Sequence, residues 1–197
     1  TLMIAERSFQ VNSFNEAKTY YRKALNIAEK NNLNTFKVRI FGGLAEIELS
    51  TNKLDAALVN INQGYNSFYE GNKSIFYLDF KSTHVKYLIE IDSLAQAKII
   101  LADNLEDYSK YKSSNGLGKT HHLIGRMHFS QKKWEKAKTA FKQSQSILNK
   151  LPDSEYSLGN YKFLAQVFAE QNQFQQAFEN LDNFQKHFDN NSHLSSS

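Results

Sequence analysis

Apolar residues return along this chain at a fixed interval of 40 residues. The pattern is an alanine with a large apolar residue three positions before it and another four positions after it, as in Trp134, Ala137 and Phe141. The five copies of the alanine are Ala17, Ala57, Ala97, Ala137 and Ala177. The large residues around them are Phe14, Leu54, Leu94, Trp134 and Phe174 before, and Tyr21, Ile61, Leu101, Phe141 and Leu181 after. A fixed period of roughly 20 to 50 residues indicates a solenoid built from one repeated unit.

Each copy is predicted to hold two facing amphipathic helices, because the apolar positions are spaced by three, four and seven residues. A small residue stands 12 positions before the alanine in four of the five copies, where two helices would cross closely. The expected helices cover about 2–10 and 14–30, 34–50 and 54–70, 75–91 and 94–110, 118–131 and 134–149, and 155–171 and 174–189. The predicted fold is all-α, an α-α superhelix.

The turn inside each pair contains mostly Asn or Asp, which tolerate the left-handed backbone that ends a helix. The turn residues are Asn12, Asn52, Asp92, Lys132 and Asn172. Short polar linkers are expected at 31–32, 71–73, 113–116 and 151–154. The predicted domain is 1–190, with repeats at about 1–32, 33–72, 73–113, 114–152 and 153–190. Residues 191–197 are low in apolar content and are expected to form a flexible tail or linker.

When the five copies are aligned on their alanines, each aligned position forms a column. These columns resemble the pattern of the tetratricopeptide repeat (TPR) family over nearly the whole chain. The best matches are the segments from Trp134 to Phe141 and from Phe14 to Tyr21. The family's usual period is about 34 residues, so the longer period here implies roughly one more turn in each helix. The resemblance implies a non-catalytic module that binds a protein or peptide segment. Longer units of this sort are similar to the sensory or scaffolding regions of bacterial signalling proteins.

The first helix of each pair is expected to line the inner groove of such an array. The columns 18, 15, 11 and 7 residues before the alanine should face that groove. The candidate ligand-groove residues are Glu46 and Glu90 among the carboxylates, and Lys86, Lys119, His122, Arg126 and Lys162 in the later, basic stretch. This stretch would suit a carboxylate, an acidic side chain or a phosphate. The alternative is a solvated charged face with no ligand. No copy pairs Lys with Asn in the manner of the co-chaperone members of the family, which disfavours binding of chaperone tails.

The amino-acid composition disfavours several classes of partner and chemistry. The formal net charge is only +4 over 197 residues, and basic residues alternate with acidic ones, so no nucleic-acid partner is expected. Cysteine is absent, which excludes disulfides, thiol catalysis and cysteine-bound zinc. No apolar run is long enough to span a bilayer, so the chain is not expected to be membrane-inserted. The lack of cysteine and the start at Thr1 favour an extracytoplasmic, periplasmic region over a cytoplasmic one.

No catalytic constellation or cofactor motif is apparent, and the chain is predicted not to be an enzyme. His121 and His128 lie seven residues apart and could share a helix face, but a metal site needs three or four converging ligands, so none is expected. His84 occupies a core column and is expected to be a buried, neutral imidazole. The run from Gly116 to Thr120 lacks the spacing of a phosphate-binding loop and is expected to cap the fourth pair.

A second function from another class remains open. The array could instead be a structural assembly module that docks through its convex face or its terminal helices, with the groove empty. Phe184 and Phe188 lie late in the last predicted helix and would then form an interface.

Overall fold

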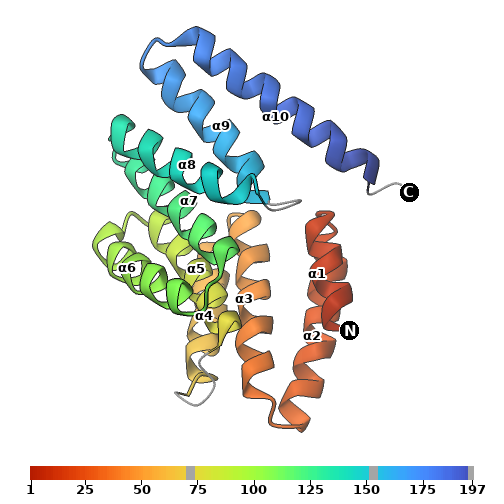
Figure 1. Ribbon diagram of the computed structural model, residues 1–197. Helices are drawn as coiled ribbons and strands as arrows, with labels where there is room; N and C mark the ends of the chain where they lie inside the picture. Colours follow the sequence, from red (N-terminus) through yellow and green to blue (C-terminus); the bar gives the residue numbers. More distant parts are fainter. Residues whose placement is uncertain (70–73, 151–154, 195–197) are drawn as a thin grey trace. The chain divides into compact units, whose positions relative to one another are not determined.

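The computed structural model describes residues 1–69, 74–150 and 155–194, and within these ranges the chain forms ten α-helices and no strand. The expected all-α fold is therefore confirmed (Figure 1). The chain divides into two compact units, Thr1–Ser93 and Leu94–Ser197. None of the described helices is both long and apolar enough to cross a bilayer.

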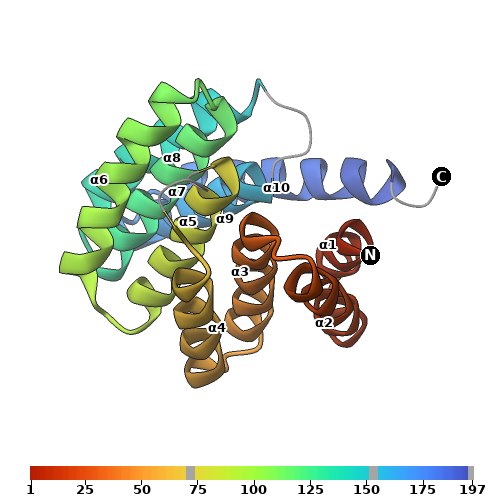
Figure 2. The same ribbon diagram turned by 90° about the horizontal axis from the view of Figure 1, so that it is seen from below.

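The helices follow the predicted pairs closely. The first unit holds α1 (Leu2–Gln10), α2 (Phe14–Lys30), α3 (Asn34–Ser50), α4 (Leu54–Asn66) and α5 (Ile75–Glu90). The second unit holds α6 (Leu94–Lys110), α7 (Ser114–Ser130), α8 (Trp134–Leu148), α9 (Glu155–Glu170) and α10 (Phe174–Leu194). Within each unit, helices that follow one another in the sequence pack side by side, as α3 with α4 and α9 with α10 (Figures 1 and 2). The exact division into five repeats stays a prediction.

Three boundaries differ from the prediction by more than one residue. Helix α4 ends at Asn66 instead of residue 70, where the Ser67 hydroxyl donates to the carbonyl of Gln63 at 2.9 Å and caps the last turn. Helix α10 continues to Leu194 instead of ending at 189. The expected flexible tail is thus helical over 191–194, and 195–197 lie outside the described residues.

The third difference is at α7, which begins at Ser114 and not at 118. Residues 114–116, expected in a linker, form its first turn, because the Ser113 side chain accepts a hydrogen bond from the backbone N–H of Gly116 at 3.1 Å. The glycines here leave room for neighbours: a Cβ on Gly116 would lie 2.1 Å from the Tyr108 ring. The predicted capping role therefore belongs to Ser113, whereas 116–120 are part of the helix. The linkers at 71–73 and 151–154 lie outside the described residues.

The left-handed turns are confirmed at all five expected positions. Asn12, Asn52, Asp92, Lys132 and Asn172 have φ between 54° and 59°. At the first turn the N–H of Asn12 donates to Phe9 O at 2.9 Å and that of Ser13 donates to Ser8 O at 2.8 Å. This pair of bonds is the Schellman motif, and it recurs at the ends of α3, α5, α7 and α9. The turn between the two helices is therefore a repeated structural element.

The repeat alanines lie in the core, as their spacing predicts. Ala17, Ala57, Ala97 and Ala137 are completely buried, and Ala177 is 8 % exposed. In the first unit the core also includes Ala5, Tyr21, Ile40 and Ile47, and in the second it includes Phe141, Leu164 and Val167. Small residues let the two helices of a pair approach, and large residues around them fill the space between pairs.

Successive pairs meet through a constant set of contacts. We call the first, fourth and eleventh residues after each repeat alanine the junction positions. At the first, Lys18 pairs with Glu48 at 2.8 Å in one unit, and Lys138 lies 5.8 Å from the Phe168 ring in the other. At the fourth, Tyr21 lies against Gly43, and Phe141 stacks on Phe163 with centroids 5.1 Å apart. At the eleventh, Tyr108 lies against Gly116.

These contacts define an antiparallel register. The junction residues at the first, fourth and eleventh positions lie on the second helix of one pair. They contact the residues that stand 9, 14 and 21 positions before the repeat alanine of the next pair, on its first helix. The contacts at the first and fourth positions appear in both units, and the contact at the eleventh position is between Tyr108 and Gly116 of the second unit.

Candidate functional site

In the first unit the predicted groove residues bind one another. Arg39 of α3 donates from Nε and Nη2 to the two carboxylate oxygens of Glu6 in α1, at 2.6 and 2.7 Å. Its guanidinium also lies 4.3 Å from the centre of the Phe76 ring in α5. A bidentate pair of this kind has fixed geometry and holds α1, α3 and α5 in register along this face.

Glu46 is satisfied in the same way by the next helix. Its Oε2 receives the Lys86 ammonium at 2.8 Å, and its Oε1 accepts a hydrogen bond from the Thr83 hydroxyl at 2.7 Å. The side chains of Lys86 and Glu46 are only 16 % and 15 % exposed. Lys86 was expected to extend the basic stretch, but the structure pairs its charge with Glu46, forty residues earlier in the same column. Glu90 lies exposed at the last residue of α5.

In the second unit, cations of α7 lie over aromatic rings of α9. The Lys119 ammonium is 5.5 Å from the centre of the Tyr156 ring, and the Arg126 guanidinium is 5.9 Å from that of Phe163. Lys162, also on α9, is exposed. We use the name α7–α9 basic face for the three cations and the two rings that contact them, namely Lys119, Arg126, Tyr156, Lys162 and Phe163. Contact of a cation with an aromatic face is worth roughly 0.5–1 kcal/mol at exposed sites, and it fixes the position of a long side chain.

His122 does not belong to that face. It is only 5 % exposed, whereas the sequence analysis placed it in the groove. The rings of Phe141, Tyr156 and Phe163 surround it, with centroids between 5.2 and 5.6 Å from its own. A Cβ on Gly159 would lie 2.9 Å from its Cε1, so the glycine makes room for the imidazole. His122 therefore packs against the rings of Tyr156 and Phe163, which contact Lys119 and Arg126.

A buried chain of hydrogen bonds orients His122. Its Nδ1 lies 2.8 Å from Oδ1 of Asn160, whose Nδ2 donates to the Ser144 hydroxyl at 2.8 Å. Ser144 in turn donates to the carbonyl oxygen of Gly118 at 2.7 Å. Because a carbonyl oxygen only accepts, the hydrogen between Asn160 and the imidazole is on Nδ1 of His122. One feature of the sequence indicates this arrangement. Ser144 is a polar residue seven positions after Ala137, on the side of the helix that is buried.

Three other histidines, His84, His121 and His128, are partly buried. His84 accepts or donates one hydrogen bond, at 2.8 Å to the Tyr65 hydroxyl, and burial lowers its pKa from the usual value of 6.5. This supports the expected neutral imidazole. Burial also lowers the pKa of His121 and of His128, whose Nδ1 atoms are buried without a hydrogen-bond partner. In the described part of the chain, no three His, Asp or Glu side chains come together in a way that could hold a metal ion.

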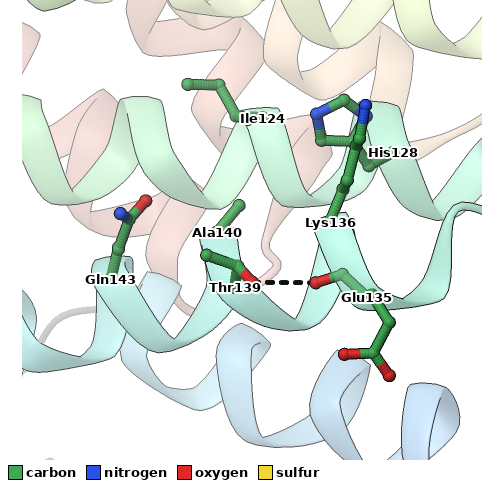
Figure 3. A pocket seen from close by; sticks show the side chains of 7 residues that line it. All are labelled: Ile124, His128, Glu135, Lys136, Thr139, Ala140 and Gln143. Atoms are coloured by element: carbon green, nitrogen blue, oxygen red, sulfur yellow. Dashed lines mark hydrogen bonds between the residues drawn. The ribbon is translucent and has the colours of Figure 1, made fainter.

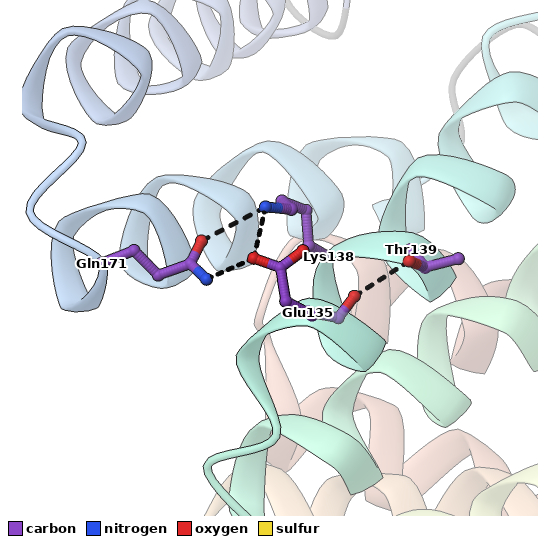
Figure 4. A network of polar contacts seen from close by, with 4 residues as sticks. All are labelled: Glu135, Lys138, Thr139 and Gln171. Atoms are coloured by element: carbon purple, nitrogen blue, oxygen red, sulfur yellow. Dashed lines mark hydrogen bonds and ion pairs between the residues drawn. The ribbon is translucent and has the colours of Figure 1, made fainter.

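An open hollow of about 330 Å³ lies between α7 and α8 (Figure 3). Its lining consists of Ile124, His128, Glu135, Lys136, Thr139, Ala140 and Gln143. The Glu135 carboxylate points away from it and instead binds Lys138 at 2.7 Å and the Gln171 side-chain amide at 2.6 Å (Figure 4). The hydrogen bond from Lys138, followed by that from Gln171, lowers the pKa of this carboxyl group. The charge of Glu135 is therefore directed to Lys138 and Gln171 and not into the hollow.

Repeated helix pairs, Schellman turns and a constant junction register define the chain as a helical repeat protein. The family model of the tetratricopeptide repeat matches residues 7–31, which cover the end of α1 and all of α2. No curated protein matches the chain.

Solved structures share the fold. A Rap protein complexed with competence and sporulation factor superposes with a TM-score of 0.83 at 14 % identity, covering 93 % of this chain and 51 % of that one. The apo form of RapI gives 0.71 at 14 % identity, covering 98 % and 70 %. The TPR-like repeats of a kinesin light chain from Podospora anserina give 0.62 at 15 % identity, covering 97 % and 94 %. The chain thus spans about half the length of the Rap protein.

These matches confirm the predicted resemblance to the tetratricopeptide repeat family. One helix pair fits the family's own pattern, and the whole fold is that of TPR-like solenoids. The chain is a helical repeat protein with the fold of TPR-like solenoids.

Proposed function

We propose that this chain binds an acidic segment of a protein or peptide on its α7–α9 basic face, as the sensory or scaffolding region of a larger bacterial signalling protein. The observation that carries the proposal is the arrangement of Lys119 over Tyr156 and Arg126 over Phe163, with Lys162 exposed nearby on α9. Three cationic side chains from two neighbouring helices favour a ligand with carboxylate groups.

The aromatic rings support the proposal in two ways. A guanidinium that contacts a ring through its flat face keeps its N–H groups in its own plane, where a carboxylate binds in a bidentate manner. The rings also offer apolar area beside the cations, and His122 with its hydrogen-bonded Asn160 holds them from below. An extended segment with an acidic residue next to an apolar one would bind the cations with its carboxylate and the aromatic rings with its apolar side chain.

The composition of the candidate groove residues supports the same assignment. In the first unit the groove cations Arg39 and Lys86 bind Glu6 and Glu46. The candidates in the second unit are Lys119, His122, Arg126 and Lys162, and none of these four is a carboxylate. The sensory or scaffolding role is supported by the shared fold of the Rap protein, which is solved in complex with competence and sporulation factor.

The test starts from a random peptide library selected on the wild-type chain, followed by fluorescence anisotropy of the selected peptides. We expect enrichment in Asp and Glu, and weaker binding at high salt. Arg126→Ala combined with Lys162→Ala should raise Kd at least tenfold, which corresponds to about 1.4 kcal/mol. Lys186→Ala is the matched control, because Lys186 is an exposed lysine that pairs with Asp182 on α10, and it should leave Kd unchanged.

Equal binding of the acidic peptides by the double variant and the wild type would place their site elsewhere and refute the proposal. Selection of neutral or basic peptides alone would do the same. The signalling role is tested in the full-length protein, where a selected peptide must change the activity of the attached domain.

A further inference from the structure

Positive charge gathers around the open hollow between α7 and α8. The His128 imidazole of α7 and the Lys136 side chain of α8 both line it (Figure 3). Burial lowers the pKa of His128, and a hydrogen bond to Gln131 partly offsets this effect. The charges of Lys136, Lys133 and Lys98 also lower it, so these three lysines lie close enough to act on the imidazole. We call them the α6–α8 lysine cluster.

The fold brings the cluster together from two helices that are 40 residues apart in the sequence. Lys98 lies near the start of α6, whereas Lys133 is the residue before α8 and Lys136 belongs to its first turn. Helices α6, α7 and α8 all belong to the second unit, so the cluster and the hollow lie within one compact unit. All three lysine side chains are exposed, so a ligand can reach them.

The cluster differs from other lysines of the same unit in lacking acidic partners. Three of those other lysines hold a carboxylate at 2.6 or 2.7 Å, namely Lys110, Lys138 and Lys186. Within the described ranges of the chain, no member of the cluster forms an ion pair with a carboxylate. The carboxylate that lines the hollow, Glu135, binds Lys138 and Gln171 instead. A negatively charged ligand would therefore meet the ammonium groups of the cluster without displacing a carboxylate of the described chain.

The size and the lining of the hollow limit that ligand. A volume of about 330 Å³ is at the lower end of the range of ligand pockets, which suits a small group. Ile124 and Ala140 give the lining an apolar part, and Thr139 and Gln143 add a hydroxyl and an amide. An anionic group that is attached to carbon would bind the lysines with its charge and contact the apolar part with its organic portion.

We propose that the hollow between α7 and α8 binds a phosphate monoester, whose phosphate pairs with the α6–α8 lysine cluster. A phosphate monoester carries about 1.5 to 2 negative charges at neutral pH, which matches several cations better than the single charge of a carboxylate does. A lysine ammonium binds phosphate as a compact point charge, whereas the planar fork of arginine is the group that matches a carboxylate. The cluster consists of lysines alone, so its chemistry differs from that of the α7–α9 basic face, and the proposal does not rest on the ligand of that face.

Phenyl phosphate tests the site on the full chain, with the imidazole in the lining as the reporter. Its titration at a pH above about 7, where the ester is close to a dianion, should shift the NMR signals of the His128 ring saturably. Binding should also raise the pKa of His128, because the negative charge opposes that of the lysines. The His84 ring in the first unit is the reference, and its signals should not move.

Replacing Lys98, Lys133 and Lys136 together with Gln should raise Kd for phenyl phosphate at least tenfold. These side chains are exposed, so the fold is retained, which circular dichroism verifies. The matched control replaces three other exposed lysines of the second unit with Gln, namely Lys110, Lys142 and Lys186. It removes the same net charge and should leave Kd unchanged. Arg126→Ala with Lys162→Ala should also leave it unchanged, which separates this site from the α7–α9 basic face.

Comparison of ligands tests the chemistry and the source of the phosphate. Benzenesulfonate has the same ring with a single negative charge and should bind more weakly than phenyl phosphate. A neutral peptide that carries one phosphoserine and glycerol 3-phosphate are then titrated in parallel. Tighter binding of the peptide assigns the phosphate to a protein side chain, and tighter binding of glycerol 3-phosphate assigns it to a small molecule.

Three results would overturn the proposal. The first is that phenyl phosphate leaves the His128 signals unchanged. The second is an equal Kd for the wild type and the variant without the lysine cluster. The third is an equal Kd for phenyl phosphate and benzenesulfonate, because the hollow would then bind any small anion.

Discussion

Tyr21 of α2 lies directly against the backbone of Gly43 in α3, so closely that a Cβ on the glycine would be 2.3 Å from Cζ of the tyrosine. Tyr21 is only 3 % exposed, so its ring is enclosed by the core. The neighbouring Gly42 is different, because a Cβ there would meet Phe80 at an ordinary 3.6 Å. Gly43 is therefore needed to make room for the Tyr21 ring, whereas the space beside Gly42 would accept a Cβ.

Gly43→Ala should destabilise the fold by about 1–3 kcal/mol, the usual cost of overpacking a core. Gly42→Ala should instead stabilise it by about 0.5–1 kcal/mol, because alanine is the better helix former. Urea unfolding of the two variants checks the prediction. Equal effects of the two substitutions would contradict it.

The ion pair between Glu46 and Lys86 should contribute measurably to stability, because both side chains are mostly buried and Thr83 adds a second bond to the carboxylate. Lys86→Met should cost about 1–3 kcal/mol, the range for hydrogen bonds to charged groups. A double-mutant cycle with Glu46→Gln isolates the pairwise energy. Lys110→Ala breaks the exposed pair with Glu106 and should cost less than about 1 kcal/mol. A coupling energy near zero at Glu46 would show that the pair contributes nothing.

Stability should fall as the pH drops below about 6.5, the ordinary pKa of histidine. Burial lowers the pKa of His84, His121 and His128 in the folded chain, so the unfolded chain binds protons first. Their contribution is intact above the unfolded pKa and is lost as the pH falls towards the folded values. Urea midpoints at pH 7.5 and 5.5 measure the change.

Replacing His84, His121 and His128 together with Gln should flatten that pH dependence relative to the wild type. The comparison removes the effect of the carboxylates, which titrate identically in both proteins. Parallel curves for the two proteins would exclude these histidines as the cause.

Asn160 should be the most sensitive member of the buried chain that includes His122 and Ser144. Asn160→Ala removes the acceptor of the His122 Nδ1–H, at a cost of about 1–3 kcal/mol for the buried group that loses its partner. The Ser144 hydroxyl loses the hydrogen bond that it accepts from Asn160 but still donates to Gly118 O. Asn180→Ala removes an exposed amide on α10 and should have little effect. Nitrogen-detected NMR of the imidazole should find the hydrogen on Nδ1 in the wild type, and a proton on Nε2 instead would contradict the assigned chain.

Lys132→Asn should stabilise the fold by about 0.5–1 kcal/mol, because asparagine tolerates the left-handed backbone at φ 54° better than lysine does. The adjacent Lys133 has φ −85° and gives the control substitution Lys133→Asn, for which no gain is expected. Thermal unfolding of both variants tests this, and a gain at Lys133 alone would refute it.

Most of the fold could be predicted from the sequence, because each structural position returns every 40 residues. The buried alanines and the left-handed Asn and Asp residues are small, local requirements that a single column expresses clearly. The start of α7 was missed because Gly116 and Gly118 are typical of a linker. Their actual role, making room for Tyr108 and Leu148, depends on residues distant from them in the sequence.

The candidate groove was harder to predict, because one column mixes environments. The column of His122 also contains the buried Gly42 and Ser82 and the exposed Lys162, so its position alone does not give its exposure. The pairing of Glu46 with Lys86 had a visible signal, opposite charges at the same position of consecutive copies. The aromatic partners of Lys119 and Arg126 had none, because Tyr156 and Phe163 also fit a plain core role.

The size matching at the fourth junction position has a consequence for how this array is assembled. Tyr21 meets a glycine, whereas Phe141 meets a phenylalanine. If these two partners were exchanged, Tyr21 would meet the Phe163 ring in place of a glycine, and Phe141 would leave a void beside Gly43. The hairpins on either side of these two junctions are therefore not interchangeable, although their sequences follow the same pattern.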